Sequence, residues 1–272
     1  MLTDKLIQAG FDRVVVLSGE DCGCPEYGSI IIALWAYEAE ARPAADGAWI
    51  HPYYFASQRA YLAAKKAVEG VDDASLRDEI RMKPIFARLP GFSQGRNTLS
   101  YVEGIGSRFH VQIIASQEPI PTTHQLEAAP HPLHCGDCRR CLDACPTHAI
   151  GEDGFHRERC QRNRLAARNM GNRLIGCDEC QRCCPKNPEP AGEPHVPVDL
   201  LDLLARTRET CAMLREQIGA NLSIPNRVLG QACLIAGCAD RKDLLDALTP
   251  LMEHPSEAVR AHAAWAFEQL NA

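Results

Sequence analysis

The 272-residue sequence lacks several features that would place it in a membrane or outside the cell. No stretch approaches the run of about eighteen apolar residues that a membrane-spanning helix needs. Residues 1–20 lack the basic start, apolar middle and small-residue cleavage site of a secretory signal peptide. We therefore expect a cytoplasmic protein without a membrane partner, whose 14 cysteines stay reduced.

The chain as a whole also lacks an excess of positive charge. Its formal net charge is −6, which argues against non-specific nucleic-acid binding by the entire surface. Residues 131–190 are the exception, with 10 Lys and Arg against 8 Asp and Glu. Six arginines fall within seventeen residues of this segment: Arg157, Arg159, Arg162, Arg164, Arg168 and Arg173. They could contact phosphate groups or offset the negative charge of a metal cluster, and the sequence leaves both interpretations open.

Four cysteines occur within eleven residues of this positive segment, in Cys135-Gly-Asp-Cys138-Arg-Arg-Cys141-Leu-Asp-Ala-Cys145-Pro146. The Cys-x2-Cys-x2-Cys-x3-Cys-Pro spacing is typical of a 4Fe-4S cluster. The first three thiolates can bind three irons of one cubane, while the fourth cysteine reaches a second cluster. The motif therefore predicts a partner motif elsewhere in the chain.

The partner motif lies downstream and again ends in Cys-Pro. It consists of the isolated Cys160 followed by Cys177-Asp-Glu-Cys180-Gln-Arg-Cys183-Cys184-Pro185. Either Cys183 or Cys184 could be a ligand, and we choose Cys184 because it precedes proline as Cys145 does. We thus assign two 4Fe-4S clusters, one on Cys135, Cys138, Cys141 and Cys184 and the other on Cys145, Cys160, Cys177 and Cys180.

A structural zinc site is the main alternative for these cysteines. Zinc sites normally use two Cys-x2-Cys pairs separated by a longer loop, not four cysteines in eleven residues followed by proline. A disulfide framework is less compatible still with the absence of a signal peptide. The spacing therefore favours iron–sulfur clusters and a role in electron transfer.

The first third of the chain is predicted to form an α/β domain. Residues 13–17, 29–37 and 108–115 are apolar runs typical of strands covered on both faces. Residues 56–69 predict a helix with Tyr61, Leu62 and Val68 as inward contacts. The crowded glycines Gly91, Gly95, Gly104 and Gly106 indicate either tight turns or a close approach of the backbone to a ligand.

The last part of the chain is predicted to be helical. Apolar residues recur at helical spacing in residues 198–208, 209–219, 228–237, 244–253 and 256–270. Residues 255–266 resemble the second helix of a HEAT repeat, whose small alanines permit close stacking. We therefore expect three domains: an α/β domain in 1–128, a ferredoxin-like double-cluster domain in 129–192 and a helical HEAT-like domain in 193–272.

This order of domains resembles that of the epoxyqueuosine reductase family, cobalamin-dependent reductases with two 4Fe-4S clusters that are related to the reductive dehalogenases. The resemblance covers most of the chain. Its most specific parts are the paired cysteine motifs with Cys160, the segment 176–180 and the closing helix. The resemblance implies that the α/β domain holds base-off cobalamin beside one cluster, and it places Arg96, Asn97, Ser107 and Arg108 near the corrin.

The resemblance also implies an activity and partners. An external donor of the ferredoxin or flavodoxin type would supply electrons, and the reduced corrinoid would remove the epoxide oxygen from a modified nucleoside of tRNA. The sequence departs from the family in a shorter amino-terminal domain. It also has Arg81-Met82-Lys83-Pro84 where the family has an aspartate-containing segment that supplies a proton. Tyr53, Tyr54 and Lys83 are possible proton donors by residue type.

Two further groups of residues have no assigned role. Cys22-Gly-Cys24 lies in the domain that the resemblance assigns to the cofactor, but two cysteines cannot complete a tetrahedral metal site by themselves. The histidines, including His51, His110 and His124, show no ligand spacing. These residues add no site to the prediction.

Three functions remain open on the sequence. The first is a corrinoid-dependent iron–sulfur reductase of epoxyqueuosine in tRNA. The second is a ferredoxin-like electron carrier or binding module without corrinoid. The third is a corrinoid-dependent reductase of a small molecule, which the acidic net charge favours.

Overall fold

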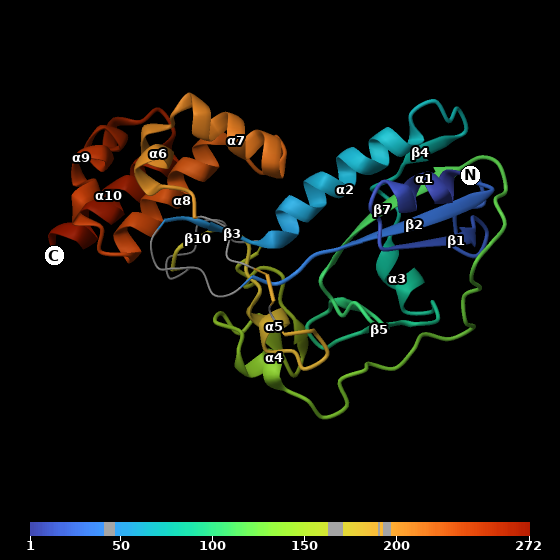
Figure 1. Ribbon diagram of the computed structural model, residues 1–272. Helices are drawn as coiled ribbons and strands as arrows, with labels where there is room; N and C mark the ends of the chain where they lie inside the picture. The colour runs from blue at the N-terminus through green and yellow to red at the C-terminus, as the bar shows by residue number, and fades with distance from the viewer. Residues whose placement is uncertain (41–46, 163–170, 190, 193–196) are drawn as a thin grey trace.

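The computed structural model describes residues 1–40, 47–162, 171–189, 191–192 and 197–272. A body of sheet and helices forms the N-terminal end of the molecule, and a group of helices forms the C-terminal end (Figure 1). The short elements that carry the cysteine motifs lie between these two ends. Across the described residues, no helix combines the length and apolar character that crossing a membrane requires.

Four antiparallel strands form the main sheet, in the order β1-β2-β7-β4. They are β1 (Arg13–Ser18), β2 (Ser29–Ala36), β4 (Ala74–Leu76) and β7 (Phe109–Ser116). The three strands predicted from apolar runs are thus confirmed. Such runs usually indicate a parallel sheet, whereas this sheet is antiparallel.

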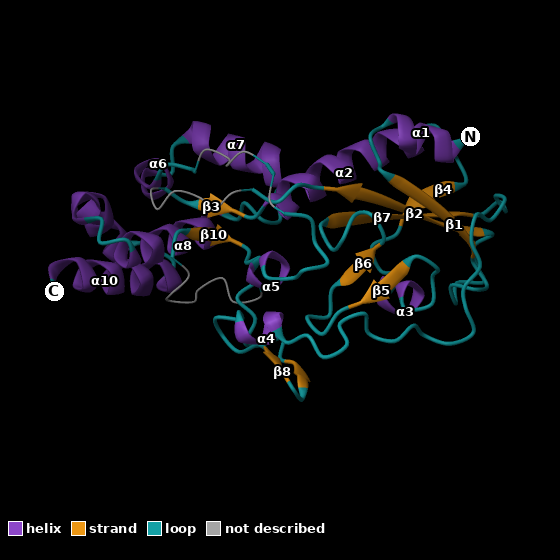
Figure 2. Ribbon diagram, turned by 60° about the horizontal axis from the view of Figure 1, so that its bottom comes forward, coloured by secondary structure: helices purple, strands orange, loops and turns teal. Residues whose placement is uncertain are grey.

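Both faces of the sheet are covered, which explains the apolar runs. Ile30 and Ile32 of β2 pack on the side of α3 (Met82–Phe86), whereas Ile31 packs on the side of α1 (Leu2–Gln8). Successive side chains of a strand point to opposite faces, so both sets must be apolar. Figure 2 shows α1 and α2 on one side of the sheet, and α3 with the β5–β6 hairpin on the other.

Helix α2 (Pro52–Val68) begins earlier than the predicted start at residue 56. The Nδ1 atom of His51 caps the helix by accepting a hydrogen bond from the Tyr53 backbone N–H at 2.9 Å. Pro52 occupies the first turn, where its missing N–H costs nothing. These two features fix the start of the helix at Pro52. This start lies near the cysteine motifs (Figure 1).

The inward face of α2 is made of alanines. Ala60, Ala64 and Ala67 are buried against the sheet, whereas Tyr61 and Leu62 are 41% and 51% exposed. The prediction that Tyr61 and Leu62 point inward is therefore wrong. The spacing of the alanines follows the helical period, and their small side chains allow the helix to lie close to the sheet.

Short elements fill the middle of the molecule. They are β3 (Trp49–Ile50), β5 (Phe92–Gln94), β6 (Ser100–Val102), α4 (Arg140–Asp143), β8 (Ile150–Gly151), β9 (Gly154–Phe155), β10 (Arg173–Ile175) and α5 (Glu179–Arg182). β5 pairs with β6, β8 pairs with β9, and β3 runs parallel to β10. The β3–β10 pair joins the N-terminal body to the cysteine-rich segment.

The C-terminal part is helical, as predicted. Its elements are α6 (Leu200–Ala205), α7 (Arg208–Ile218), α8 (Pro225–Cys238), the 3-10 turn η1 (Lys242–Leu244), α9 (Leu245–Leu248), the 3-10 turn η2 (Thr249–Glu253) and α10 (Glu257–Asn271). The predicted helix over 244–253 is broken into short pieces. Pro250 stands at the start of η2, where it cannot donate the backbone hydrogen bond that a continuous α-helix needs.

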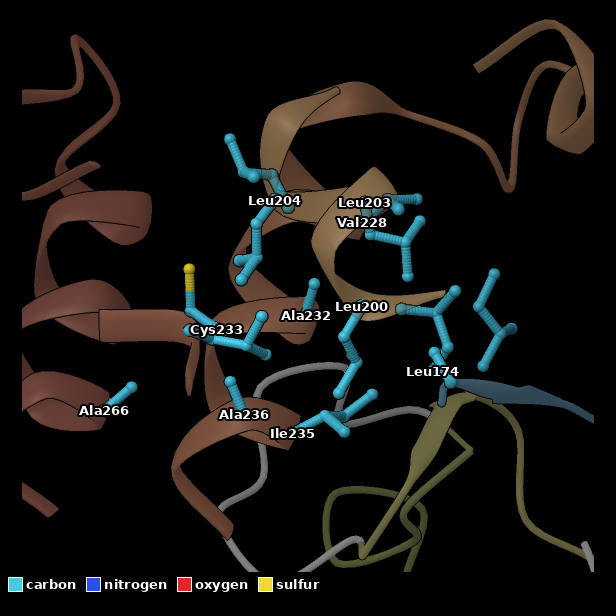
Figure 3. Packing of buried hydrophobic residues seen from close by; sticks show 14 of the residues in the cluster. Leu174, Leu200, Leu203, Leu204, Val228, Ala232, Cys233, Ile235, Ala236 and Ala266 are labelled. Atoms are coloured by element: carbon cyan, nitrogen blue, oxygen red, sulfur yellow. The ribbon is translucent and has the colours of Figure 1, made fainter. Parts of the chain in front are cut away.

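The largest hydrophobic core is shared between the C-terminal helices and the middle of the chain. Leu200, Leu229 and Ile235 of the helices pack in one cluster with Ile50 of β3 and Leu174 of β10. Figure 3 shows Leu174 beside Leu200 and Val228 in this core. The helices therefore depend on the β3–β10 pair for part of their burial.

The variant Leu229→Ala tests how much this core contributes to the free energy of unfolding. Leu229 is fully buried in α8, and removing its side chain should lower the free energy of unfolding by about 2–5 kcal/mol. The matched control is Leu201→Ala, because Leu201 is 51% exposed on α6 and its loss should cost no more than about 0.5 kcal/mol. Urea denaturation of both variants measures the difference, and equal destabilisation would contradict this account of the core.

Candidate functional site

The two cysteine motifs form two short helices that pack against each other, α4 and α5. Cys141 is the second residue of α4, and Cys180 is the second residue of α5. In each case the cysteine therefore occupies the same place in a one-turn helix. The two halves of the segment repeat the same local structure.

The repeat continues at the end of each helix. The backbone N–H groups of Cys145 and Cys184 each donate to the carbonyl three residues earlier, at 3.3 Å in both cases. Both cysteines are followed by proline. Cys184 thus occupies the place of Cys145, whereas Cys183 caps α5 in the place that Ala144 has after α4.

In the first predicted group, three other thiols lie near enough to Cys141 to act on it electrostatically, although the part of the chain that the structure describes holds no three His, Cys, Asp or Glu side chains already placed to bind a metal ion. Burial raises the pKa of the Cys141 thiol, and the nearby thiols of Cys135, Cys184 and Cys138 add to this effect. Thiolates this close repel one another until a cation balances their charge. The arrangement is therefore suited to a positively charged iron core.

In the second predicted group, Cys177 and Cys160 act electrostatically on Cys180. Burial raises the pKa of Cys180, and the charges of Cys177 and Cys160 raise it further. Burial has the same effect on Cys145, but backbone N–H groups outweigh it and lower the pKa of this thiol. One of these donors is the N–H of Ala149, at 3.2 Å from the sulfur. Such hydrogen bonds stabilise a thiolate and tune the potential of a cluster that it binds.

A cavity of about 510 Å³ opens between the cysteine-rich segment and the N-terminal body. Cys145, Cys160, Cys177 and Cys180 all lie along its wall. The described lining contains no member of the other cysteine group. One predicted cluster therefore lies next to the cavity and the other lies farther from it.

Aromatic and basic side chains form the remainder of the cavity wall. Tyr37 follows β2, Tyr53 and Tyr54 lie in the first turn of α2, Lys83 lies in α3, and Arg162 follows Cys160. The Arg162 guanidinium carbon lies 4.6 Å from the ring centroid of Tyr53 and 6.0 Å from that of Tyr54. The cavity thus has thiols on one side and hydroxyl groups with cations on another.

Gln181 connects these two sides. Its side-chain oxygen accepts a hydrogen bond from the Tyr37 hydroxyl at 3.3 Å and lies 3.2 Å from Nε2 of His51. Its Nε2 atom donates to the Ser107 carbonyl at 2.9 Å. His51 is buried, and this burial lowers its pKa to about 3, so its ring is neutral. The sequence analysis missed Gln181, although its place between Cys180 and Cys184 indicates that it lies inside the site.

Two of the residues expected near a corrin contact the cysteine-rich segment directly. The backbone N–H of Arg96 donates to the sulfur of Cys135 at 3.3 Å, and its guanidinium donates to the Gly136 carbonyl at 2.8 Å. The Arg108 guanidinium donates to the Pro188 carbonyl at 2.5 Å. Neither arginine is part of the described cavity wall. Both hold the cysteine-rich segment against the N-terminal body.

The other two expected residues, Asn97 and Ser107, line the cavity. The Asn97 amide donates to the Tyr101 hydroxyl at 3.1 Å and to the Cys180 carbonyl at 3.3 Å. Tyr101 in turn donates to the sulfur of Cys184 at 3.1 Å. Tyr101 was not predicted, because nothing in the pattern of β6 distinguishes it from a core aromatic residue.

One of the closely spaced glycines, Gly106, lies where the N-terminal body packs against the cysteine-rich segment. Gly106 has φ +79°, and a Cβ atom there would lie 2.5 Å from Oδ1 of Asn187. The same Asn187 oxygen accepts a hydrogen bond from the Ser107 backbone N–H at 2.7 Å. A side chain at position 106 would therefore force the cysteine-rich segment away.

The arginines of the stretch 157–173 lie in different environments. Arg157 and Arg162 line the cavity, and Arg173 forms an ion pair with Glu179. Arg159 lies on the surface, 4.0 Å from Glu158. Arg164 and Arg168 lie outside the described residues.

Cys22 and Cys24 lie apart from these groups. They occupy the loop between β1 and β2 and pack beside the sheet core, and neither lines the cavity. Burial raises the pKa of Cys22 to about 12, so this thiol stays protonated near neutral pH. The pair is consistent with a packing role.

Comparison with known proteins agrees with the geometry of the cysteines. Residues 134–187 match the family described as a 4Fe-4S double cluster binding domain. This segment of the chain is therefore a 4Fe-4S double cluster binding domain. The chain's epoxyqueuosine reductase relative from Pseudomonas aeruginosa is 30% identical over 202 residues, covering 64% of this chain and 53% of the relative. Over about two thirds of its length, the chain is thus similar in sequence to epoxyqueuosine reductases.

Solved structures show the same fold. An epoxyqueuosine reductase crystallised with an epoxyqueuosine-modified tRNA stem loop matches all of this chain and 89% of its own, with a TM-score of 0.74 and 20% identity. The reductive dehalogenase NpRdhA matches 86% of this chain and 35% of its own, with a TM-score of 0.52 and 16% identity. The Bacillus subtilis epoxyqueuosine reductase is 33% identical over 159 residues. The chain spans about half the length of the curated relatives it matches.

Proposed function

We propose that the protein is an iron–sulfur reductase that removes the epoxide oxygen of epoxyqueuosine in tRNA with the help of a corrinoid. The placement of Cys145, Cys160, Cys177 and Cys180 along the cavity wall carries this proposal, because it sets an electron-carrying group beside a space for a ligand. The names of the relatives support the choice of substrate. The electron donor would be an external protein of the ferredoxin or flavodoxin type, and the location would be cytoplasmic.

The ligand assignment follows from the repeated structure of the two motifs. Cys145, Cys160, Cys177 and Cys180 would hold the 4Fe-4S cluster beside the cavity. Cys135, Cys138, Cys141 and Cys184 would hold the other one. When bound, such clusters supply electrons one at a time.

The cavity also suits a base-off corrinoid, which supplies a strongly reducing cobalt centre when bound. His51 is the histidine in the described lining, and both of its ring nitrogens are engaged. No imidazole in this lining is therefore free to coordinate cobalt. Asn97 and Ser107 would face the corrin, while Arg96 and Arg108 would keep the cysteine-rich segment in place.

The C-terminal helices would form a HEAT-like scaffold, and the segment boundaries would follow the predicted domains 1–128, 129–192 and 193–272. Helices α8 and α10 pack closely, since a Cβ atom on Gly237 would lie 2.9 Å from the Ala266 Cα. Residues 191–272 carry 7 Lys and Arg against 11 Asp and Glu. Contacts to tRNA phosphates would therefore come mainly from the arginine-rich stretch 157–173, and they should weaken steeply with salt.

The deciding assay supplies epoxyqueuosine-containing tRNA, a strong reductant and cobalamin, and looks for queuosine in the nucleoside digest. We expect product that depends on cobalamin. A parallel titration with hydroxocobalamin should give the electron paramagnetic spectrum of base-off cob(II)alamin. The absence of binding at saturating cobalamin would favour a ferredoxin-like electron carrier.

A corrinoid-dependent reductase of a small molecule is the second candidate. One observation favours it: Glu179 is the carboxylate in the described cavity lining, and it is already paired with Arg173. The catalytic loop of the Bacillus subtilis epoxyqueuosine reductase structure carries an aspartate. Bound cobalamin without turnover of tRNA, and without salt-sensitive tRNA binding, would favour this second function.

A further inference from the structure

The proposed reaction needs a proton source in the cavity. Converting an epoxide into an alkene releases the oxygen as water and consumes two electrons and two protons. A general acid must lie within hydrogen-bond reach of the leaving oxygen. In the described cavity wall the carboxylate is that of Glu179, which is paired with Arg173, so the candidates for a general acid are the other described side chains of this wall.

The Tyr53 hydroxyl is part of a hydrogen-bonded chain that starts in the sheet. Nε2 of Gln112 lies 2.8 Å from Nε2 of His110, and Nδ1 of His110 lies 3.1 Å from the Tyr53 hydroxyl. With the amide nitrogen of Gln112 facing the ring, Nε2 of His110 accepts and its Nδ1 carries the proton. His110 therefore donates to Tyr53, and the tyrosine O–H remains free to donate elsewhere.

The neutral state of His110 agrees with this direction. Burial, and then the charge of Arg162, lowers the pKa of His110 to about 4. A neutral imidazole has one N–H, and the contact with Gln112 fixes that N–H on the Tyr53 side. His110 thus orients the Tyr53 oxygen without being the source of the proton.

Arg162 lies beside the ring of the same tyrosine. Its guanidinium carbon lies 4.6 Å from the centroid of the Tyr53 ring, so a permanent positive charge stands beside this phenol. That charge would stabilise the phenolate that remains after the proton has left.

The other polar groups of the cavity are less suited to this role. The Tyr37 O–H is already donated to Gln181, and burial raises the pKa of this phenol. Tyr54 is 7% exposed and packs into the largest hydrophobic core. Lys83 lies on α3, where burial and then Arg162 lower the pKa of its amine, and it remains an alternative for experiment to exclude.

We propose that Tyr53 is the general acid of this site, with His110 as the positioning residue that holds its oxygen and Arg162 as the cation beside its ring that stabilises its conjugate base. This inference rests on the proposed reductive function. Tyr53 gives its proton to the oxygen as the carbon–oxygen bond breaks and becomes a phenolate, which solvent then reprotonates. The electrons come from the external donor of the proposed function, and the second proton comes from solvent.

Tyr53→Phe keeps the ring and removes the acid. In single-turnover conversion of epoxyqueuosine tRNA by reduced, corrinoid-loaded protein, we expect a loss of about a hundredfold or more. Iron content and cobalamin affinity should stay at wild-type values. The matched control is Tyr61→Phe, because Tyr61 lies on the same helix, is 41% exposed and is not part of the described cavity wall; it should stay within about threefold of wild type. Added imidazolium buffer should accelerate Tyr53→Phe and leave wild type unchanged, because only a missing acid can be replaced by a dissolved one.

A spectroscopic test separates this proposal from the function on which it rests. Nitrogen NMR of histidine-labelled protein, without corrinoid or substrate, should show the proton of His110 on Nδ1 and a change of that signal in Tyr53→Phe. A proton on Nε2 would overturn the proposal, as would a Tyr53→Phe variant of undiminished rate beside an inactive Lys83→Met variant. If wild-type protein binds cobalamin but converts no epoxyqueuosine, the proposed function fails while the NMR result still decides the Tyr53–His110 arrangement.

Discussion

Cys184→Ala should leave anaerobically reconstituted protein with about four irons and four sulfides per chain, against about eight of each in wild type. The reason is the repeated structure of α4 and α5, in which Cys184 occupies the place of Cys145; in the proposed assignment it binds the cluster held by the other motif. Cys145→Ala should remove the reciprocal cluster. Iron and sulfide analysis, combined with the electron paramagnetic spectrum of the reduced protein, measures both losses.

Cys183→Ala is the matched control, because Cys183 is the neighbour of Cys184 and stands where α4 is followed by Ala144. It should keep about eight irons. Loss of a cluster in Cys183→Ala with full retention in Cys184→Ala would contradict the assignment. Stoichiometric zinc without sulfide in the wild-type protein would contradict the cluster prediction altogether.

Gly176→Ala should lower both stability and iron content. Gly176 has φ +94°, and a Cβ atom there would lie 2.6 Å from the His51 Cβ and 2.8 Å from Cε2 of Tyr54. Backbone strain and overpacking together should cost about 2–4 kcal/mol of unfolding free energy. The displaced backbone also carries Cys177, so part of the neighbouring cluster should be lost. Denaturation under anaerobic conditions and iron analysis check the two effects.

The variant Gly171→Ala separates the effect of the steric clash at Gly176 from the effect of backbone strain at a positive φ. Gly171 also has positive φ, at +60°, but a Cβ atom there would have no neighbour within 4 Å among the described residues. This variant should lose only about 1–2 kcal/mol and keep its iron. Equal losses in the two variants would show that crowding against His51 and Tyr54 is unimportant.

The sequence predicts those parts of the molecule that depend on local pattern. The apolar runs of β1, β2 and β7 indicate strands because burial on both faces requires an apolar residue at every position. The grouping of the cysteines follows from the short spacing that a cubane imposes. The break in the helix predicted over 244–253 also had a visible cause in Pro250.

The antiparallel order of the sheet and the polar wall of the cavity could not be predicted in this way. The Tyr37 and His51 side chains meet Gln181 across 144 and 130 residues of chain. Short-range patterns in the sequence cannot predict contacts between residues so far apart in the chain. The inward face of α2 was misjudged for a related reason, since a preference for large apolar contacts overlooks a helix that approaches its sheet through Ala60 and Ala64.

The β3–β10 pair has a consequence for how the molecule unfolds. It links Trp49 to Arg173 and Ile50 to Ile175, one residue before His51 and two before Cys177. The same short ladder thus adjoins the first turn of α2, the cysteines beside the cavity and the core of the C-terminal helices. A protein joined in this way should melt as a single cooperative unit, and removal of iron should loosen distant helices together with the cysteine loops.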